Sequence, residues 1–336
     1  MDIVCDKSTA EEVPLYSPQF LWSGTEWDEP SINAFTERTC DLINAICELA
    51  ETGSYDPPYS LRYVVVASDF ESAVCYWQQQ LGEPEGVSAD AFGKTFFWNS
   101  GSQDSTYSII VISESIARCF LGGHDVPEQL YVAATNTIAH ELGHIIWDQI
   151  ALAAFGEQKL PTPGLPTWRR LIAKSALSEA FASMIASRHT PERDLHDDDG
   201  TQLAKDILNE ALNKIALAEE ECGVNDFLSR LITELADVFS QFGRSIGCDT
   251  DAGLNQKLID AVNIVSSGWG DIATDVAEAI THLLETPNSI DVDSFDKLED
   301  AVELGFRIAL GDEGFSLLHS LNLAPTTPQQ GSEPSL

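Results

Sequence analysis

The sequence predicts an α+β protein in which a small sheet with its helices is followed by an all-helical C-terminal part. Runs rich in β-branched and aromatic residues at 62–67, 95–98 and 107–112 are typical of strands. Elsewhere apolar residues recur every three to four positions, which is the helical period. Beyond residue 200 only this period is found, so we expect the strands to belong to the first part of the chain.

The first regular element should be a helix that follows an irregular start. Residues 1–30 contain three prolines among acidic and aromatic side chains and show no period, which predicts an irregular lead-in. Ser31 resembles a helix N-cap, and Gly53 is placed to end the helix. Apolar residues on one face mark its buried side: Phe35, Leu42, Ile43, Ile46 and Leu49.

A strand, a helix and two further strands are expected next. The run 62–67 ends at Ser68-Asp69, and apolar residues then continue at helical spacing up to Gly82. The two later runs, 95–98 and 107–112, are joined by a segment that begins Asn-Ser-Gly-Ser, which favours a hairpin. These strands predict a small sheet that precedes the most informative helix of the chain.

That helix carries the sequence His140-Glu141-Leu142-Gly143-His144. Four residues advance an α-helix by little more than one turn, so the two imidazoles lie on one face and can both bind one cation. Glu141 lies about 100° further round the helix, placed to take a proton from a water molecule on that cation. Two histidines and an adjacent base are the elements of a metal-dependent hydrolase.

A second helix should follow the first after a proline-rich loop. The motif helix is predicted from Pro127 to Phe155, and prolines between 161 and 166 turn the chain before the next helix. Glu179 lies in the middle of this second helix, in an apolar setting where a carboxylate needs either a cation or solvent. Four alanines at 176, 180, 182 and 186 should let this helix approach the motif helix closely.

The motif resembles the active-site helix of the zincin metallopeptidases. The extended zincin pattern would require Gly at 147 and His at 150, where this chain has Trp147 and Ile150. The resemblance is therefore to the gluzincins, which take their third zinc ligand from a Glu on a downstream helix. Glu179 matches that role best, and Glu157 is the rival, although Gly156 suggests that the motif helix has ended before it.

The resemblance implies a zincin-like catalytic domain of residues 31–190 that binds zinc (Zn2+) through His140, His144 and Glu179, with Glu141 as catalytic base. Such a protein would hydrolyse peptide bonds of a protein or peptide substrate, which we expect to be a specific intracellular partner. In this family an edge strand of the sheet borders the cleft and holds an extended peptide. Many gluzincins have an Asp where this chain has Ser183, so support for the ligands should come from another residue.

The charge of the chain excludes some partners. Eighteen basic residues against fifty-four acidic ones give a net charge of −36, which repels nucleic-acid backbones and anionic membranes. The excess serves either solubility in a salty environment or attraction of a basic protein partner. It also leaves a competing function open, in which a non-catalytic acidic protein binds partners or mimics nucleic acid and keeps the motif as a structural metal site.

The location of the protein is expected to be cytoplasmic. The chain opens with an acidic segment rather than a signal sequence, and no apolar run reaches the eighteen or so residues that a membrane helix requires. Its seven cysteines are scattered without a CxxC pair, which favours reduced thiols over disulfides.

The C-terminal part should be a helical bundle. Residues 191–200 are charged and without period, and they predict a domain boundary. Several helices follow in a domain of residues 201–321, with Gly223, Gly243 and the pair Gly268 and Gly270 expected as helix stops. A proline-containing tail, 322–336, is predicted to be disordered.

Overall fold

The computed structural model describes residues 18–53, 58–81, 92–99, 106–122, 126–155, 167–190, 199–221, 223–248, 252–285, 290 and 292–320. By contacts between Cα atoms, the chain divides into two compact units. The first comprises Met1–Ala153, Arg188–Glu192 and Thr327–Leu336, and the second comprises Ala154–Ser187 and Arg193–Thr326. The predicted α+β class is confirmed in its coarse form, because a small sheet accompanies many helices.

The first unit is built on a four-stranded sheet with the strand order β1-β2-β4-β3. Strands β1 (Gln19–Ser23), β2 (Leu61–Ala67) and β4 (Thr106–Ser113) are parallel, whereas β3 (Gly93–Asn99) runs antiparallel to β4. The predicted pairing of the last two strands is therefore confirmed. The connection between them, residues 100–105, lies outside the described residues.

Strand β1 corrects the expectation of an irregular lead-in. Residues 19–23 pair along their whole length with β2, although the segment has only one buried side chain, Phe20. A short strand at the edge of a sheet needs few inward-facing residues, so the period that marks a strand is too short here to be seen in sequence. The earlier residues of the expected lead-in, 1–17, are outside the described part of the chain.

The described part of the first unit contains the helices α1 (Glu29–Gly53), α2 (Phe70–Leu81), α3 (Glu114–Leu121) and, up to Ala153, α4 (Glu128–Phe155). Helix α1 ends at Gly53 as predicted, but its first turn is capped by Asp28, whose carboxylate accepts a hydrogen bond from the Ser31 backbone N–H at 3.0 Å. Ser31 is thus the donor, and the acidic Asp28 is the better cap because it also complements the positive helix end.

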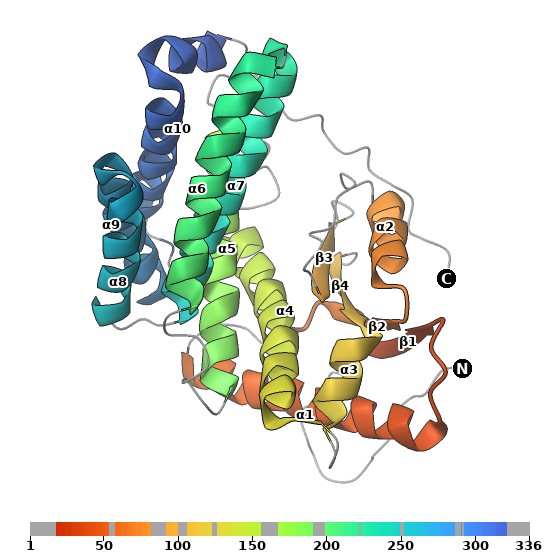
Figure 1. Cartoon of the computed structure of the whole chain (residues 1–336). Helices are drawn as coiled ribbons and strands as arrows, with labels where there is room; N and C mark the ends of the chain where they lie inside the picture. The colour runs from red at the N-terminus through yellow and green to blue at the C-terminus, as the bar shows by residue number, and fades with distance from the viewer. Residues whose placement is uncertain are drawn as a thin grey trace. The chain divides into compact units, whose positions relative to one another are not determined.

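The core of this unit lies on both faces of the central strands. Tyr63, Val65 and Val111 form one face with residues of β3 and pack against Val74 and Trp77 of α2, and Figure 1 shows α2 lying along the sheet. The alternate residues of β2 and β4 are also buried, because α3 packs on these strands as well. A sheet covered on both sides explains why its central strands are continuous apolar runs.

The second unit is helical. It contains α5 (Thr167–His189) up to Ser187, α6 (Asp199–Glu221), α7 (Val224–Cys248), α8 (Ala252–Val265), α9 (Ser267–Glu285) and α10 (Val292–Ser320). Aromatic side chains of α7 and α9 meet in its core, where Phe239 and Phe242 contact Trp269 with ring centroids 6.1 and 6.5 Å apart. The predicted tail 322–336 lies outside the described residues.

Helix α5 groups with the helices that follow it rather than with the sheet. Arg169 forms ion pairs with Glu299 and Glu303 of α10, which explains part of this association. The domain division expected from sequence, with a boundary after residue 190, assigned this helix to the first part of the chain. The charged segment that suggested the boundary, 191–198, is outside the described residues.

Three of the expected helix stops lie inside helices. Gly243 is part of α7, and both Gly268 and Gly270 are part of α9, whereas Gly223 does precede a helix. A glycine within a helix usually has a packing reason, because it costs about 0.5–1 kcal/mol relative to alanine. For Gly243 that reason is a neighbouring helix, described below.

None of the helices in the described ranges is long and apolar enough to cross a membrane. Five of the seven cysteines lie in these ranges, and all five are free thiols.

Candidate metal centre

Helix α4 carries the histidine motif within a largely buried environment. Ile138, Leu142, Ile145 and Ile146 are at most 1% exposed, so apolar residues surround the motif on several sides of the helix. Such a helix forms because tertiary packing stabilises it along its length. The helix spans Glu128–Phe155, so it begins one residue after the predicted start, Pro127, and ends at the predicted residue.

The imidazoles of His140 and His144 converge. Their Nε2 atoms lie 3.1 Å apart, and the two rings are perpendicular, with centroids 4.7 Å apart. Two nitrogens bound to one tetrahedral zinc at 2.0–2.1 Å would be separated by roughly 3.3 Å. The observed separation is therefore close to the one that two ligands of a single zinc ion require.

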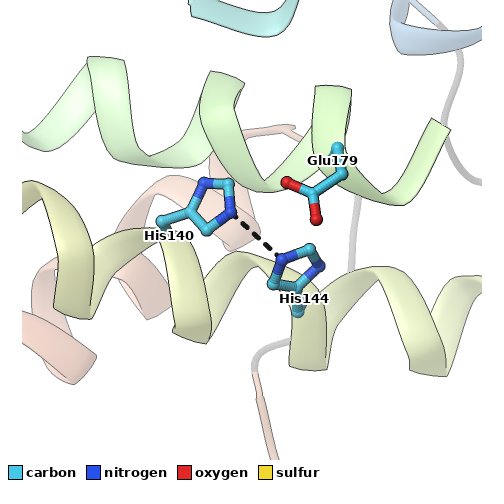
Figure 2. Close-up of side chains that lie close together, drawn as sticks. All are labelled: His140, His144 and Glu179. Atoms are coloured by element: carbon cyan, nitrogen blue, oxygen red, sulfur yellow. Dashed lines mark hydrogen bonds between the residues drawn. The ribbon is translucent and has the colours of Figure 1, made fainter. Parts of the chain in front are cut away.

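Glu179 on α5 is the third member of the group. The ligand atoms of His140, His144 and Glu179 all lie within 4.8 Å of one another, and the three side chains are partly buried. Figure 2 shows the carboxylate of Glu179 directed toward both imidazoles. Among the described residues, these three side chains form a group that can hold a metal ion.

The donor set fits a catalytic metal better than a purely structural one. Two imidazole nitrogens and one carboxylate are the ligands of catalytic His2Glu zinc sites, in which the fourth position is left for water or substrate. Structural zinc sites usually contain four protein ligands with several cysteines. The described part of the chain brings no cysteine into this group.

Glu179 is held in place by an arginine that the sequence did not suggest. Nε and Nη2 of Arg244, on α7, donate hydrogen bonds to Glu179 Oε2 at 3.0 and 2.9 Å. The side chain of Glu179 is only 18% exposed, whereas that of Arg244 is 50% exposed. The two residues are 65 positions apart, so no spacing rule within one helix could have paired them.

Glu141, the expected base, is buried beside the sheet. Its side chain is 7% exposed, and Oε2 accepts a hydrogen bond from the Thr95 hydroxyl at 2.7 Å. The same hydroxyl lies 3.0 Å from the Glu141 backbone carbonyl, but it has only one proton to donate. Thr95 belongs to β3, so the edge strand of the sheet fixes the orientation of this carboxylate.

Gly93, also on β3, leaves space for the same carboxylate. A Cβ atom at this position would lie 2.9 Å from Glu141 Cγ and 3.0 Å from Glu141 Oε1. Both distances are at or inside the limit of normal carbon contacts, and the carboxylate would have to move. Neither Gly93 nor Thr95 was identified from sequence, since their roles depend on the register between β3 and α4.

The structure thus brings together three of the predicted site residues and places the fourth next to two of them. His140, His144 and Glu179 share one group, and Glu141 lies beside the histidines on α4. The rival ligand, Glu157, lies outside the described residues. Ser183, which stands where many gluzincins have an Asp, is 2% exposed within α5.

Comparisons of the chain with models of protein families, with curated proteins and with solved structures gave no match. The assignment of a function therefore depends on the geometry and chemistry of this group.

Proposed function

We propose that the protein is a zinc-dependent metallopeptidase that hydrolyses peptide bonds of a protein substrate. The observation that carries the proposal is the convergence of His140, His144 and Glu179, with the buried carboxylate of Glu141 between the two histidines in sequence. The donor set matches the His2Glu arrangement of catalytic zinc. The gluzincin-like character of the domain, inferred from the motif, belongs to this proposal.

When bound, zinc supplies Lewis-acid chemistry, because it polarises a carbonyl group and makes a neighbouring water molecule more acidic. His140, His144 and Glu179 would hold the ion. Glu141 takes the proton of the attacking water and delivers it to the amine that leaves the peptide bond. Thr95 keeps the base oriented, since its hydroxyl occupies Oε2 of the carboxylate.

The arrangement of the sheet supports a peptide as substrate. Strand β3 is the last strand in the order β1-β2-β4-β3, so it can offer main-chain N–H and C=O groups along its second edge. An extended peptide can add to such an edge as a further strand. Because Thr95 of β3 donates a hydrogen bond to the proposed base, a peptide on this edge would lie near Glu141.

The decisive experiment compares the wild type with Glu141→Gln in a proteomic search for new protein N-termini. The substitution keeps both histidines and Glu179, so we expect unchanged folding and zinc content but a loss of cleavage by several orders of magnitude. N-termini that appear with the wild type and not with the variant identify the substrate. Equal turnover by both proteins would remove Glu141 from the mechanism.

The same experiment addresses the competing function as an acidic binding protein, which the net charge of −36 favours. A binding protein with a structural metal site would retain zinc in both proteins, produce no new N-termini and still retain its partner. The new N-termini would also identify the protein that is cleaved, which we expect to be a specific intracellular partner.

A further inference from the structure

The third ligand of the proposed site lies against the backbone of another helix. Two glycines of α7, Gly243 and Gly247, face the carbonyl groups of Ala176 and Ala180 on α5, and a Cβ atom on either glycine would overlap the facing carbonyl oxygen. The two helices therefore approach each other at the distance that only glycine permits. Glu179 lies between the two alanines in sequence, one residue before Ala180.

Arg244 follows the first of these glycines directly. The close approach of the helices brings its guanidinium to Glu179, and both Nε and Nη2 donate to the same oxygen, Oε2. Two donors in a rigid planar group restrict a carboxylate more than one donor on a flexible chain does. Residues 243–247 of α7 thus constrain both the position of α5 beside Glu179 and the orientation of the Glu179 carboxylate.

We propose that Arg244 is a positioning residue for the metal ion, acting through Glu179, and that α7 is thereby a functional part of the site. The inference depends on the proposed function only in taking Glu179 as a metal ligand. Helix α7 would then support the metal site without supplying a ligand to it, so no motif in the α7 sequence indicates this role.

Arg244 affects metal binding in two opposing ways, by repelling the cation and by orienting Glu179. Its positive charge repels a cation, but the guanidinium is half exposed, and solvent screens this repulsion strongly. Its hydrogen bonds help to keep the Glu179 side chain in the ligating rotamer, and loss of such outer partners typically lowers metal affinity about 10–100-fold. The positioning effect should therefore dominate.

The test measures the zinc dissociation constant by competition with a chromophoric chelator, together with the melting temperature of the metal-free protein. Arg244→Met removes the donors and the charge but keeps much of the side-chain length, and Arg244→Lys keeps the charge with a single ammonium group. Arg307→Met is the matched control, because Arg307 is also 50% exposed and also pairs with a partly buried glutamate, Glu303.

We expect the zinc dissociation constant to rise about 10–100-fold in Arg244→Met, to recover in part in Arg244→Lys, and to stay at the wild-type value in Arg307→Met. The melting temperature of the metal-free protein should change similarly in both methionine variants, since each loses one exposed ion pair. A role in helix packing alone would alter the melting temperature of Arg244→Met without altering its zinc affinity.

An unchanged or tighter zinc affinity in Arg244→Met would overturn the inference and leave the proposed function intact. If the methionine variant does not fold, the comparison of Arg244→Lys with the wild type decides in the same way, because lysine cannot reproduce two donors on one oxygen. Failure of the wild type to bind zinc at all would instead overturn the proposed function, and the two failures are therefore distinguishable.

Discussion

At the scale of single residues, the chemistry depends on contacts between groups that are distant in sequence. Glu141 is oriented by Thr95, which lies 46 positions earlier in the chain, and has the space for its carboxylate at Gly93, which lies 48 positions earlier. Glu179 is oriented by Arg244, 65 positions later. A motif of five residues therefore specifies the reactive groups, while their orientation is set by the fold.

The space at Gly93 leads to a prediction for the proposed base. In Gly93→Ala the new methyl group meets Glu141 Cγ at 2.9 Å and displaces the carboxylate. We expect cleavage to fall by about tenfold or more, since a shift of roughly 1 Å can cost 10²-fold, while zinc content stays at the wild-type level. Turnover and zinc per chain are measured on the same preparations.

The control for this substitution is Gly223→Ala, because a Cβ at Gly223 meets no atom within 4 Å. Its turnover should equal that of the wild type. Equal turnover in Gly93→Ala would show that the base does not occupy the position seen beside β3.

The third ligand can be tested against its rival by measuring zinc per chain. Glu179→Ala removes one of three ligand atoms that lie within 4.8 Å of one another, so most bound zinc should be lost. Glu157→Ala should bind zinc nearly as the wild type does, since the helical position of Glu179 already completes the three-ligand set. Full zinc in Glu179→Ala with loss in Glu157→Ala would reverse the assignment.

At the scale of elements, helices and central strands were predictable where a period extends over several residues. Helix α4 and the paired strands β3 and β4 follow from such patterns. Strand β1 and helix α3 do not, because β1 has a single buried residue and α3 spans only eight positions, 114–121. The cap of α1 was assigned to Ser31 rather than Asp28, three residues away, since both residue types are favourable caps.

Glycines show more clearly that a local sequence pattern does not reveal tertiary contacts. From sequence, Gly243 was expected to end a helix, yet it lies within α7. A glycine is needed there because the backbone of α5 leaves no space for a Cβ atom. The alanines of α5 indicated close packing correctly, but the helix that meets Ala176 and Ala180 is α7, whereas the sequence suggested the motif helix. Small residues predict that a close contact exists, and only the fold determines its partner.

This packing predicts the result of Gly247→Ala. Alanine favours a helix by up to about 1 kcal/mol relative to glycine, but here its methyl group overlaps the Ala180 carbonyl, which cannot move aside without shifting the α5 backbone. Overpacking of this kind costs about 1–3 kcal/mol. We expect a lower free energy of unfolding, measured by urea denaturation.

Gly268→Ala provides the comparison, because its Cβ would meet the flexible end of Ile308 at 3.0 Å and the Ser266 hydroxyl at 4.0 Å, with no backbone atom among these contacts. In that helix the propensity of alanine should prevail, and stability should be unchanged or higher. A Gly247→Ala protein as stable as Gly268→Ala would show that α5 and α7 are not in backbone contact.

At the scale of the whole molecule, the charge is the dominant property. A net charge of −36 on 336 residues creates self-repulsion that opposes the compact state. Salt screens this repulsion and limits its range to about 10 Å at 0.1 M and to a shorter distance at higher concentration. If the charge serves salt tolerance, the melting temperature should rise steadily from low to molar salt, as measured by differential scanning calorimetry. A flat response would favour recognition of a basic partner instead.

The wide separation of the site residues along the chain also has a consequence for synthesis on the ribosome. The histidines and Glu141 are made first, Glu179 follows, and the 65 residues from Glu179 to Arg244 take on the order of 3–13 s at ribosomal speeds. During that interval the nascent chain contains Glu141 and Glu179 but not Arg244, the residue that orients Glu179. The proposed peptidase would therefore acquire its activity only after Arg244 has been made, late in the synthesis of its own chain.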